Sequence, residues 1–252
     1  MKISALIVAH NEEKVIADAI DSVTFCDEVI VLNNASTDRT GEVAKQCGAK
    51  VFEDPQKAYV SYAQLHNTVL KKAKSEWVLY LDADERITPE LQKNILDAIE
   101  KDDKEYGSYE LERQNYYLGK FAWPQREFFA RLFRRETLHE WKGDLHETAY
   151  FDGKKGRLPG LFLHFTHEDL ANMLDKTIHW STLEARFRLE AHHPRIVWWR
   201  FFRVFLTGFW NSFIKQKGYT IGTPGLVESI YQGYSMFITY AKVWEQQTRK
   251  LS

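Results

Sequence analysis

Two aspartates one residue apart, Asp82 and Asp84, are the side chains of this sequence best placed for chemistry. They directly follow the apolar run 78–81, which indicates a buried strand. Two carboxylates at a strand end can hold a hard divalent cation, Mg²⁺ or Mn²⁺, because such cations take oxygen ligands and bridge diphosphate oxygens. The cation would neutralise charge on a departing nucleotide diphosphate. The same pair of residues also occurs in solvated turns and helix caps, so the surrounding sequence must show whether this pair binds a metal.

The segments around this pair alternate between strand and helix. Strands are expected at 3–9, 28–32, 50–53 and 77–81, and helices at 15–23, 36–48, 62–74 and 88–100. This order predicts a doubly wound, mostly parallel α/β sheet. Ligands of such sheets bind beyond the carboxyl ends of the strands. Asn11, Asn33 and Asp82 all fall at predicted strand ends, so the sequence places a site there.

The alternation stops after Asp103. Residues 109–117 and 128–135 indicate extended segments, and 195–215 has helical periodicity with a polar stripe inside a wide aromatic face. A turn-rich connection then leads to a final amphipathic helix at 227–244. We expect the chain to end in a helical, aromatic-rich extension.

Composition narrows the class of protein. The chain has 252 residues, of which 44% are hydrophobic and 27% charged, so one α/β domain with an appendage and a substantial core is expected. A net charge of −1 argues against nucleic-acid binding. Cys26 and Cys47 have no metal-like spacing, and the N-terminus begins with a strand rather than a signal peptide, so a cytoplasmic chain is expected.

Three motifs together resemble the family 2 glycosyltransferases, which have the GT-A fold. They are Ala9-His10-Asn11-Glu12-Glu13, Val31-Leu32-Asn33-Asn34-Ala35-Ser36-Thr37-Asp38-Arg39-Thr40 and Leu81-Asp82-Ala83-Asp84-Glu85, in the family's order and at its intervals. The resemblance covers residues 2–100 well and extends loosely beyond, toward the branch that contains lipopolysaccharide inner-core β-glycosyltransferases. It implies an inverting transferase that moves one sugar from a nucleotide sugar to an acceptor hydroxyl. The processive members' Q-x-x-R-W motif is absent from this sequence, so single transfer is expected.

The resemblance also implies which residues surround the donor. In the family, the ends of the first two strands and the D-x-D motif enclose the nucleotide. The matching positions here are Ala9, Asn11, Glu12, Asn33, Asp82 and Ala83. Glu12 could instead cap the following helix. Asn33 departs from the family, which usually has Asp there; a UDP-sugar is expected, but an amide both donates and accepts, so the nucleobase stays open.

The catalytic base and the remaining ligands are expected from the second half of the catalytic region. His146-Glu147 matches a Gly-x-x-His-Glu segment of related enzymes, which implies Glu147 as base, with Asp144 as the alternative. Arg131 and Arg134 are candidates for binding the diphosphate or an acceptor phosphate, or for pairing with Glu147. His164 is expected either as a third metal ligand beside Asp82 and Asp84 or as a core histidine.

These expectations define domains and partners. A GT-A-like catalytic domain is expected at 1–190, with a nucleotide-sugar half at 1–103 and an acceptor half at 104–190, followed by the helical extension at 191–252. The expected acceptor is lipopolysaccharide core or another lipid-linked glycan. Residues 195–252 carry eight Lys/Arg and two Asp/Glu, which suits an anionic membrane surface on the cytoplasmic face. Packing on the catalytic domain or on a second subunit of a homo-oligomer is the alternative.

Other functions remain open at this point. A sugar nucleotidyltransferase also uses a strand-end carboxylate and a metal, but it would carry a glycine- and lysine-rich triphosphate loop where this chain has His10-Asn11-Glu12-Glu13. A dinucleotide dehydrogenase would need Gly-x-Gly-x-x-Gly after the first strand. An inactive transferase-like binding or scaffold subunit is a third alternative, and Asn33 would then mark lost activity.

Overall fold

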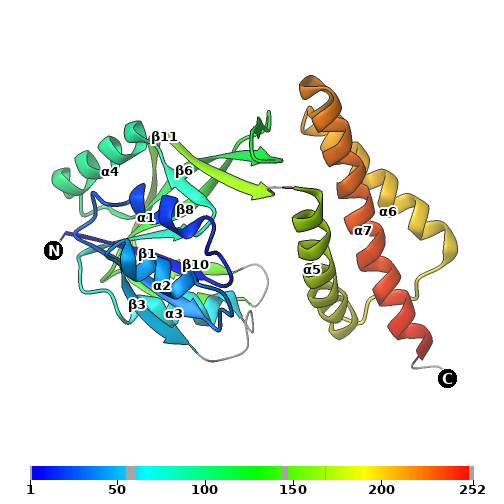
Figure 1. The fold of residues 1–252 in the computed structure, drawn as a ribbon, viewed down its shortest axis with the longest axis horizontal. Helices are drawn as coiled ribbons and strands as arrows, with labels where there is room; N and C mark the ends of the chain where they lie inside the picture. The colour runs from blue at the N-terminus through cyan, green and yellow to red at the C-terminus, as the bar shows by residue number, and fades with distance from the viewer. Residues whose placement is uncertain (1, 55–60, 144–146, 168, 250–252) are drawn as a thin grey trace. The chain divides into compact units, whose positions relative to one another are not determined.

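The computed structural model describes residues 2–54, 61–143, 147–167 and 169–249 (Figure 1). The chain forms two compact units. The first unit comprises 1–114 and 127–164, and the second comprises 115–126 and 165–252. The second unit thus takes in the excursion at 115–126 as well as the chain from Phe165 onward, and the catalytic domain expected at 1–190 stays a prediction.

The first unit is built around a mixed sheet. In the described residues the sheet has nine strands in the order β3-β2-β1-β4-β8-β6-β11-β5, with β7 paired to β6. The strands β3, β2, β1 and β4 are parallel, and β8 continues the sheet antiparallel to β4. The bounds of these strands are β1 Ile3–Ala9, β2 Glu28–Asn34, β3 Lys50–Asp54, β4 Trp77–Asp82, β5 Glu85–Ile87, β6 Tyr106–Tyr117, β7 Phe121–Ala122, β8 Glu127–Arg134 and β11 Lys154–His167. A separate antiparallel pair consists of β9 Leu138–Lys142 and β10 Thr148–Phe151.

Helices cover both faces of the parallel strands. One apolar cluster takes Ile3, Ala5 and Ile7 of β1 together with side chains of α1 (Ile16–Asp21), α2 (Thr40–Gln46) and α4 (Pro89–Lys101). The other takes Leu6 together with side chains of α3 (Tyr62–Leu70) and β9. Successive side chains of a strand point to opposite faces, so β1 feeds both clusters. The expected doubly wound α/β architecture is confirmed.

The second unit is helical. It contains α5 (Leu170–Glu190), α6 (Trp198–Trp210) and α7 (Thr223–Arg249), with a π-helical turn at Asn211–Lys215 and a 3-10 turn at Gly218–Ile221. The helices α6 and α7 run antiparallel and pack closely (Figure 1). Gly233 permits this close approach, since a Cβ there would lie only 2.8 Å from the Phe205 carbonyl oxygen. Tyr231 of α7 reaches α5, where its hydroxyl donates to the Met173 carbonyl at 2.7 Å. The expected helical, aromatic-rich C-terminal region is confirmed, and α5 adds a helix that the sequence did not predict.

Candidate functional site

The ends of three parallel strands bring the predicted residues to one edge of the sheet. The register pairs Ala9 of β1 with Asn33 of β2, and Val8 of β1 with Asp82 of β4. The three strands end within two residues of each other in this register, because buried apolar side chains fix their register on both faces. Asn33 and Asp82 therefore lie at the same edge of the sheet, on the two strands that flank β1, as the alternating pattern of the sequence predicted.

Asp82 is held by a buried cluster, named here the Arg131 cluster, of Asp82, Glu85 and Arg131. The Arg131 Nη2 donates to Asp82 Oδ2 and to Glu85 Oε1, both at 2.7 Å. Glu85 also accepts the Asp82 backbone N–H through Oε2 at 3.0 Å. The Glu85 side chain is 0% exposed and the Arg131 side chain 10%, whereas 43% of the Asp82 side chain is open. Asp82 is thus the one carboxylate of the cluster that is open to solvent, and the buried Glu85 and Arg131 side chains hold it in place.

Electrostatics keep Asp82 ionised in this cluster. Burial opposes the charge on Asp82, but the Arg131 guanidinium outweighs it and holds the pKa of Asp82 below its usual range, while the neighbouring Asp84 carboxylate acts the other way. Burial raises the pKa of Glu85 in spite of Arg131. Although burial disfavours a charged arginine, Asp82 and then Glu85 raise the pKa of Arg131. We conclude that Asp82 and Arg131 are a charged pair.

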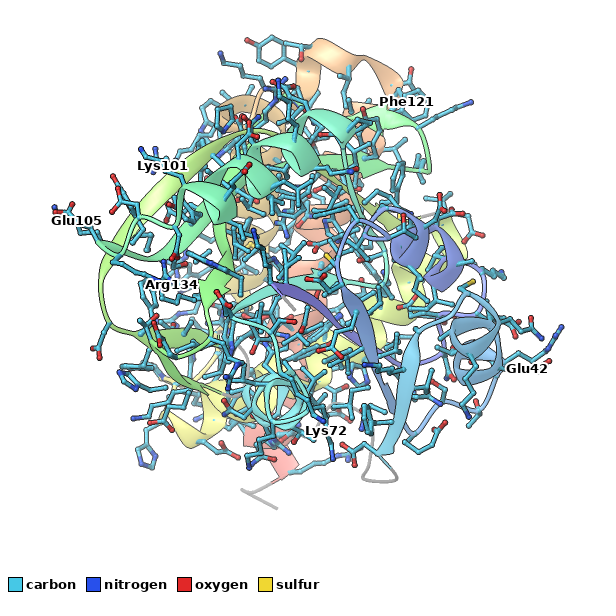
Figure 2. The ribbon with its side chains drawn as sticks, turned by 90° about the vertical axis from the view of Figure 1, so that its left-hand side faces the viewer. Glu42, Lys72, Lys101, Glu105, Phe121 and Arg134 are labelled. Atoms are coloured by element: carbon cyan, nitrogen blue, oxygen red, sulfur yellow. The ribbon has the colours of Figure 1, made fainter. Side chains whose placement is uncertain are left out.

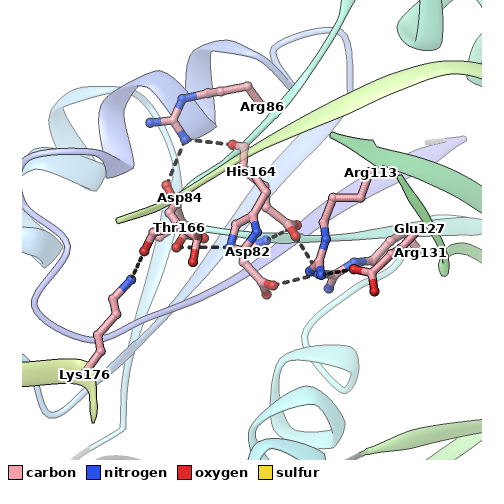
Figure 3. Close-up of polar contacts among 11 residues, drawn as sticks. Asp82, Asp84, Arg86, Arg113, Glu127, Arg131, His164, Thr166 and Lys176 are labelled. Atoms are coloured by element: carbon pink, nitrogen blue, oxygen red, sulfur yellow. Dashed lines mark hydrogen bonds and ion pairs between the residues drawn. The ribbon is translucent and has the colours of Figure 1, made fainter. Parts of the chain in front are cut away.

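Asp84 pairs with a histidine from β11. His164 Nε2 lies 3.4 Å from Asp84 Oδ2, and both side chains are 17% exposed (Figure 3). Burial alone would lower the pKa of His164, but the Asp84 carboxylate raises it above its ordinary value. The register of β11 with β5 sets His164 opposite Glu85 and so delivers the imidazole to the turn that carries Asp84. His164 therefore lies beside Asp84, and its role as a metal ligand stays a prediction.

The turn that carries these aspartates is fixed by Arg86. Its Nη1 donates to the carbonyls of Ala83 at 2.9 Å and Glu85 at 2.7 Å. Its Nη2 donates to the Val15 carbonyl at 2.7 Å, which ties the turn to the start of α1. The side chain of Ala83 is buried, so this residue contributes its backbone to the turn. Arg86 thereby fixes the positions from which Asp82 and Asp84 project.

The donor set fits a divalent cation that brings ligands of its own. Asp82 and Asp84 are close enough for each to oppose the other's charge, and hard oxygen donors suit Mg²⁺ or Mn²⁺. Among the described residues, no three His, Cys, Asp or Glu side chains lie together in a group that could hold a metal ion. Asp82 is directed to Arg131 and His164 to Asp84, so the expected three-residue ligand set is not assembled. A cation here would need diphosphate oxygens or water to complete its shell.

The loop after β1 is held by Asn11 and Glu12. Asn11 has φ 57°, and its Oδ1 accepts the Thr37 backbone N–H at 2.7 Å. The Glu12 carbonyl accepts the N–H of Ile16 at 2.9 Å. The N-cap residue of α1 is Val15, whose side chain makes no capping hydrogen bond, and the role of the Glu12 carboxylate stays a prediction. The Asn11 amide therefore joins the β1 and β2 loops that border the sheet edge.

Asn33 is paired with an acid on the neighbouring strand. Its Nδ2 donates to Glu53 Oε2 at 2.7 Å, while its Oδ1 is buried without a hydrogen-bond partner among the described residues. Gly41 makes room for the pair, because a Cβ there would lie 2.7 Å from Asn33 Nδ2. A buried acceptor without a donor is costly and marks a place where a ligand N–H would be stabilising.

The remaining predicted residues divide between this site and other places. Glu147 is half-buried and acts electrostatically on Arg131, which sets it near the Arg131 cluster. Asp144 lies outside the described residues. Arg134, which is labelled in Figure 2, is not brought to the site. Its Nη1 lies 2.8 Å from Asp102 Oδ1, and its guanidinium stacks on Trp77, at the start of β4. We therefore leave Arg134 out of the site.

Two site residues were not predicted from the sequence. Glu85 directly follows the D-x-D motif, and that adjacency was the available signal. His66 of α3 is buried between the rings of Tyr80 and Trp141, and burial lowers its pKa to about 4 although Asp82 opposes this. His66 lies on the apolar face of a helix, and nothing in the sequence around it indicates that it is close to Asp82.

Comparison with known proteins identifies the family of this chain. Residues 4–151 match the model of glycosyl transferase family 2. The chain is 29% identical to an uncharacterized glycosyltransferase of Rickettsia typhi, over 97% of this chain and 87% of that protein. It is 24% identical to the lipopolysaccharide core biosynthesis glycosyltransferase LpsC of Rhizobium meliloti, over 99% of this chain and 94% of that protein.

Among solved structures, the fold is similar to glucosyl-3-phosphoglycerate synthase from Mycobacterium tuberculosis in complex with Mn²⁺, UDP and phosphoglyceric acid. The TM-score is 0.39 at 20% identity, over 54% of this chain and 57% of that chain, so this chain spans just over half of that enzyme. The family match, in contrast, covers more than half of this chain, from β1 through β10. The chain therefore belongs to glycosyl transferase family 2 and is a glycosyltransferase.

Proposed function

We propose that this glycosyltransferase transfers one sugar, with inversion and with the help of Mg²⁺ or Mn²⁺, from a UDP-sugar to a hydroxyl of lipopolysaccharide core or another lipid-linked glycan. The observation that carries the proposal is the position of Asp82 and Asp84 at the end of β4, beside the ends of β1 and β2. That edge is where open parallel sheets bind their ligands.

The Arg131 cluster prepares the donor end of this reaction. Arg131 keeps Asp82 ionised, and Arg86 fixes the turn so that Asp82 and Asp84 face the same region. When bound, a divalent cation would supply charge neutralisation at the departing diphosphate. Asp82 and Asp84 would hold it, and the His164 imidazole keeps Asp84 in place. These residues would orient the leaving group. Because they are already held in place, they would not have to rearrange during the reaction.

Glu147 is the proposed base. Inversion requires a base that takes the acceptor proton while the hydroxyl attacks the anomeric carbon opposite the nucleotide. Glu147 lies near enough to Arg131 to influence its pKa, which supports a base close to Asp82 and Asp84. Asp144 stays the alternative. Replacing Glu147 with Gln should lower kcat by roughly 10²-fold or more while leaving donor binding intact.

The proposed UDP specificity rests on Asn33 and Glu53. Because Glu53 accepts from Asn33 Nδ2, the amide orientation leaves Oδ1 as the acceptor that faces away from Glu53. An acceptor at this position can do what a carboxylate does for a base ring N–H. In Glu53→Gln the amide is free to flip, so discrimination between UDP and CDP in a thermal-shift assay should weaken. The exposed Glu42→Gln on α2 is the matched control.

The proposed acceptor class comes from the relatives. LpsC of Rhizobium meliloti is named for lipopolysaccharide core biosynthesis and aligns along nearly its whole length. The experiment is release of UDP from a panel of UDP-sugars with truncated lipopolysaccharide as acceptor, with and without a chelator. Wild type should turn over only with metal, and Asp84→Ala should lose at least about 10²-fold, while the exposed Asp97→Ala on α4 should not.

Each other outcome of this assay contradicts the proposal. Full-rate, chelator-insensitive transfer by Asp84→Ala would remove the metal role. Release of pyrophosphate from sugar phosphate and nucleoside triphosphate would indicate a nucleotidyltransferase. Donor binding without transfer or hydrolysis would indicate an inactive binding subunit.

A further inference from the structure

Helix α6 exposes a continuous apolar row on the side that faces away from α7. The row recurs every four residues, so its members lie along one side of the helix. On the opposite side, Gly208 packs against the α7 backbone, with a Cβ position 2.8 Å from the Gln232 carbonyl oxygen. The exposed fractions are 74%, 66%, 61% and 55% for Trp198, Phe202, Leu206 and Trp210. A row of this size, with three aromatic members, marks an interaction surface.

The segment of the chain that contains this row carries basic residues and no acidic ones. Residues 191–227 contain five Lys/Arg and no Asp/Glu: Arg195, Arg200, Arg203, Lys215 and Lys217. Two of them lie against an exposed tryptophan of the same helix, since the Arg200 and Arg203 guanidiniums lie 5.8 and 5.4 Å from the Trp199 ring centre. Aromatic side chains and cations are thus presented together, which is the arrangement that suits an anionic lipid headgroup layer.

The neighbouring helices show that this combination is specific to α6. Helix α5 also exposes apolar side chains, including Leu174 at 46% and Ile178 at 61%, but it carries three basic and three acidic residues. Helix α7 exposes Ile230 at 46% and Trp244 at 47% and carries two of each sign. Apolar exposure alone therefore does not distinguish α6, and the uncompensated positive charge does.

The length of α6 determines how it can meet a membrane. Its 13 residues span about 20 Å, less than the hydrocarbon thickness of a bilayer. No helix in the described ranges combines the length and apolar character needed to cross a bilayer. A short helix with one aromatic row and basic flanks lies in the plane of the interface, with the row inserted below the headgroups.

We propose that α6 docks the protein onto a bilayer containing anionic lipids, with Trp198, Phe202, Leu206 and Trp210 inserted and the five cations at the headgroups. A second copy of the chain is the less favourable occupant, because two copies meeting through α6 would bring together the ten positive charges of their 191–227 segments, which contain no acid to pair them. The inference is independent of the proposed reaction, since vesicle binding needs neither donor nor acceptor.

The test is cosedimentation of the full chain with vesicles of phosphatidylcholine alone and of phosphatidylcholine with phosphatidylglycerol. Wild type should bind the anionic vesicles, and binding should fall as salt rises. Trp198→Ser with Phe202→Ser should reduce binding about tenfold or more, because both side chains lose their apolar contact with lipid. Leu174→Ser with Ile178→Ser on α5 is the matched control and should bind as wild type does.

A further variant separates charge from apolar insertion. Arg195→Gln with Lys217→Gln should weaken binding to anionic vesicles and reduce its dependence on salt. Absence of wild-type binding, equal binding to neutral vesicles at every salt concentration, or undiminished binding by the tryptophan variant would each overturn the proposal. If wild type dimerises without binding vesicles, and Trp198→Ser with Phe202→Ser abolishes the dimer, the row is a self-association surface and the proposal is overturned. Circular dichroism of each variant confirms that it is folded.

Discussion

The Arg131 cluster of the first unit and the surroundings of Glu228 in the second bury carboxylates in different ways. Glu85 is fully buried but receives hydrogen bonds from Arg131 and the Asp82 backbone. Glu228 of α7 is 1% exposed; its Oε1 accepts from Gln232 at 2.7 Å, and its Oε2 has no hydrogen-bond partner among the described residues. Burial raises the pKa of Glu228 to about 7.

This difference shows what a buried acid needs in order to serve a site. The Arg131 guanidinium orients both carboxylates of the Arg131 cluster and keeps Asp82 charged, although burial still raises the pKa of Glu85 to about 7. Without such a partner, burial favours the neutral form of Glu228, so the contribution of this residue to stability depends on pH. The two environments should therefore respond differently to substitution and to pH.

The largest effect should come from breaking the Arg131 cluster. Arg131→Met leaves Asp82 and Glu85 without their cation in a buried place, so the free energy of unfolding should fall by about 3–5 kcal/mol. Urea unfolding followed by tryptophan fluorescence measures it. Arg157→Met is the control, because Arg157 pairs with Glu110 with 64% of its side chain exposed and should cost less than about 1 kcal/mol. Equal losses in the two variants would contradict the role of the cluster.

An intermediate effect of opposite sign is expected for Glu228→Gln. The pKa of Glu228 is raised from 4.5 to about 7 in the folded state, so the folded state retains a proton that the unfolded state has released. The stability that this group contributes is present below pH 4.5 and is lost as pH rises through about 7. A glutamine never ionises, so the variant should gain on the order of 2 kcal/mol over wild type at pH 8 and little at pH 5.

Thermal unfolding at pH 5 and pH 8 tests this. Glu245→Gln is the matched control on the same helix, because Glu245 is 49% exposed and pairs with Arg249. A change that is the same at both pH values would show that Glu228 does not ionise on unfolding in the way proposed.

The smallest effect should come from Arg131→Lys. The positive charge remains, but the planar guanidinium that lies 5.8 Å from the Phe162 ring centre and bridges Asp82 and Glu85 is lost. We expect a loss of about 1–2 kcal/mol, less than for Arg131→Met. A lysine variant as unstable as the methionine variant would show that geometry, rather than charge, holds the cluster.

The sequence predicted the first unit better than the second for physical reasons. Strands β1, β2 and β4 are buried on both faces, so they appear as continuous apolar runs between turn signals, and their ends located Asn33 and Asp82. Helix α5 was missed because it exposes Leu170, Leu174 and Ile178, and an apolar residue on the solvent side removes the periodic contrast that indicates a helix.

Within the site, prediction failed where tertiary contacts decide. Arg131 and Arg134 looked equivalent, yet Arg131 is the residue that the pairing of β8 with β6 skips, between Ala130 and Leu132. Because β8 is antiparallel to β4 and Arg134 pairs with Trp77, Arg131 lies toward the strand end that carries Asp82. The burial of Glu85 and the nearness of His66 depend on packing between segments that sequence spacing does not report.

The proposal that Asp82 and Asp84 bind the donor diphosphate through a divalent cation is tested most directly by calorimetric titration of UDP into the protein. With Mn²⁺ present, wild type should bind UDP, and removal of the metal or the substitution Asp84→Asn should weaken binding at least about tenfold. Equal affinity for UDP with and without Mn²⁺, in wild type and Asp84→Asn alike, would contradict it.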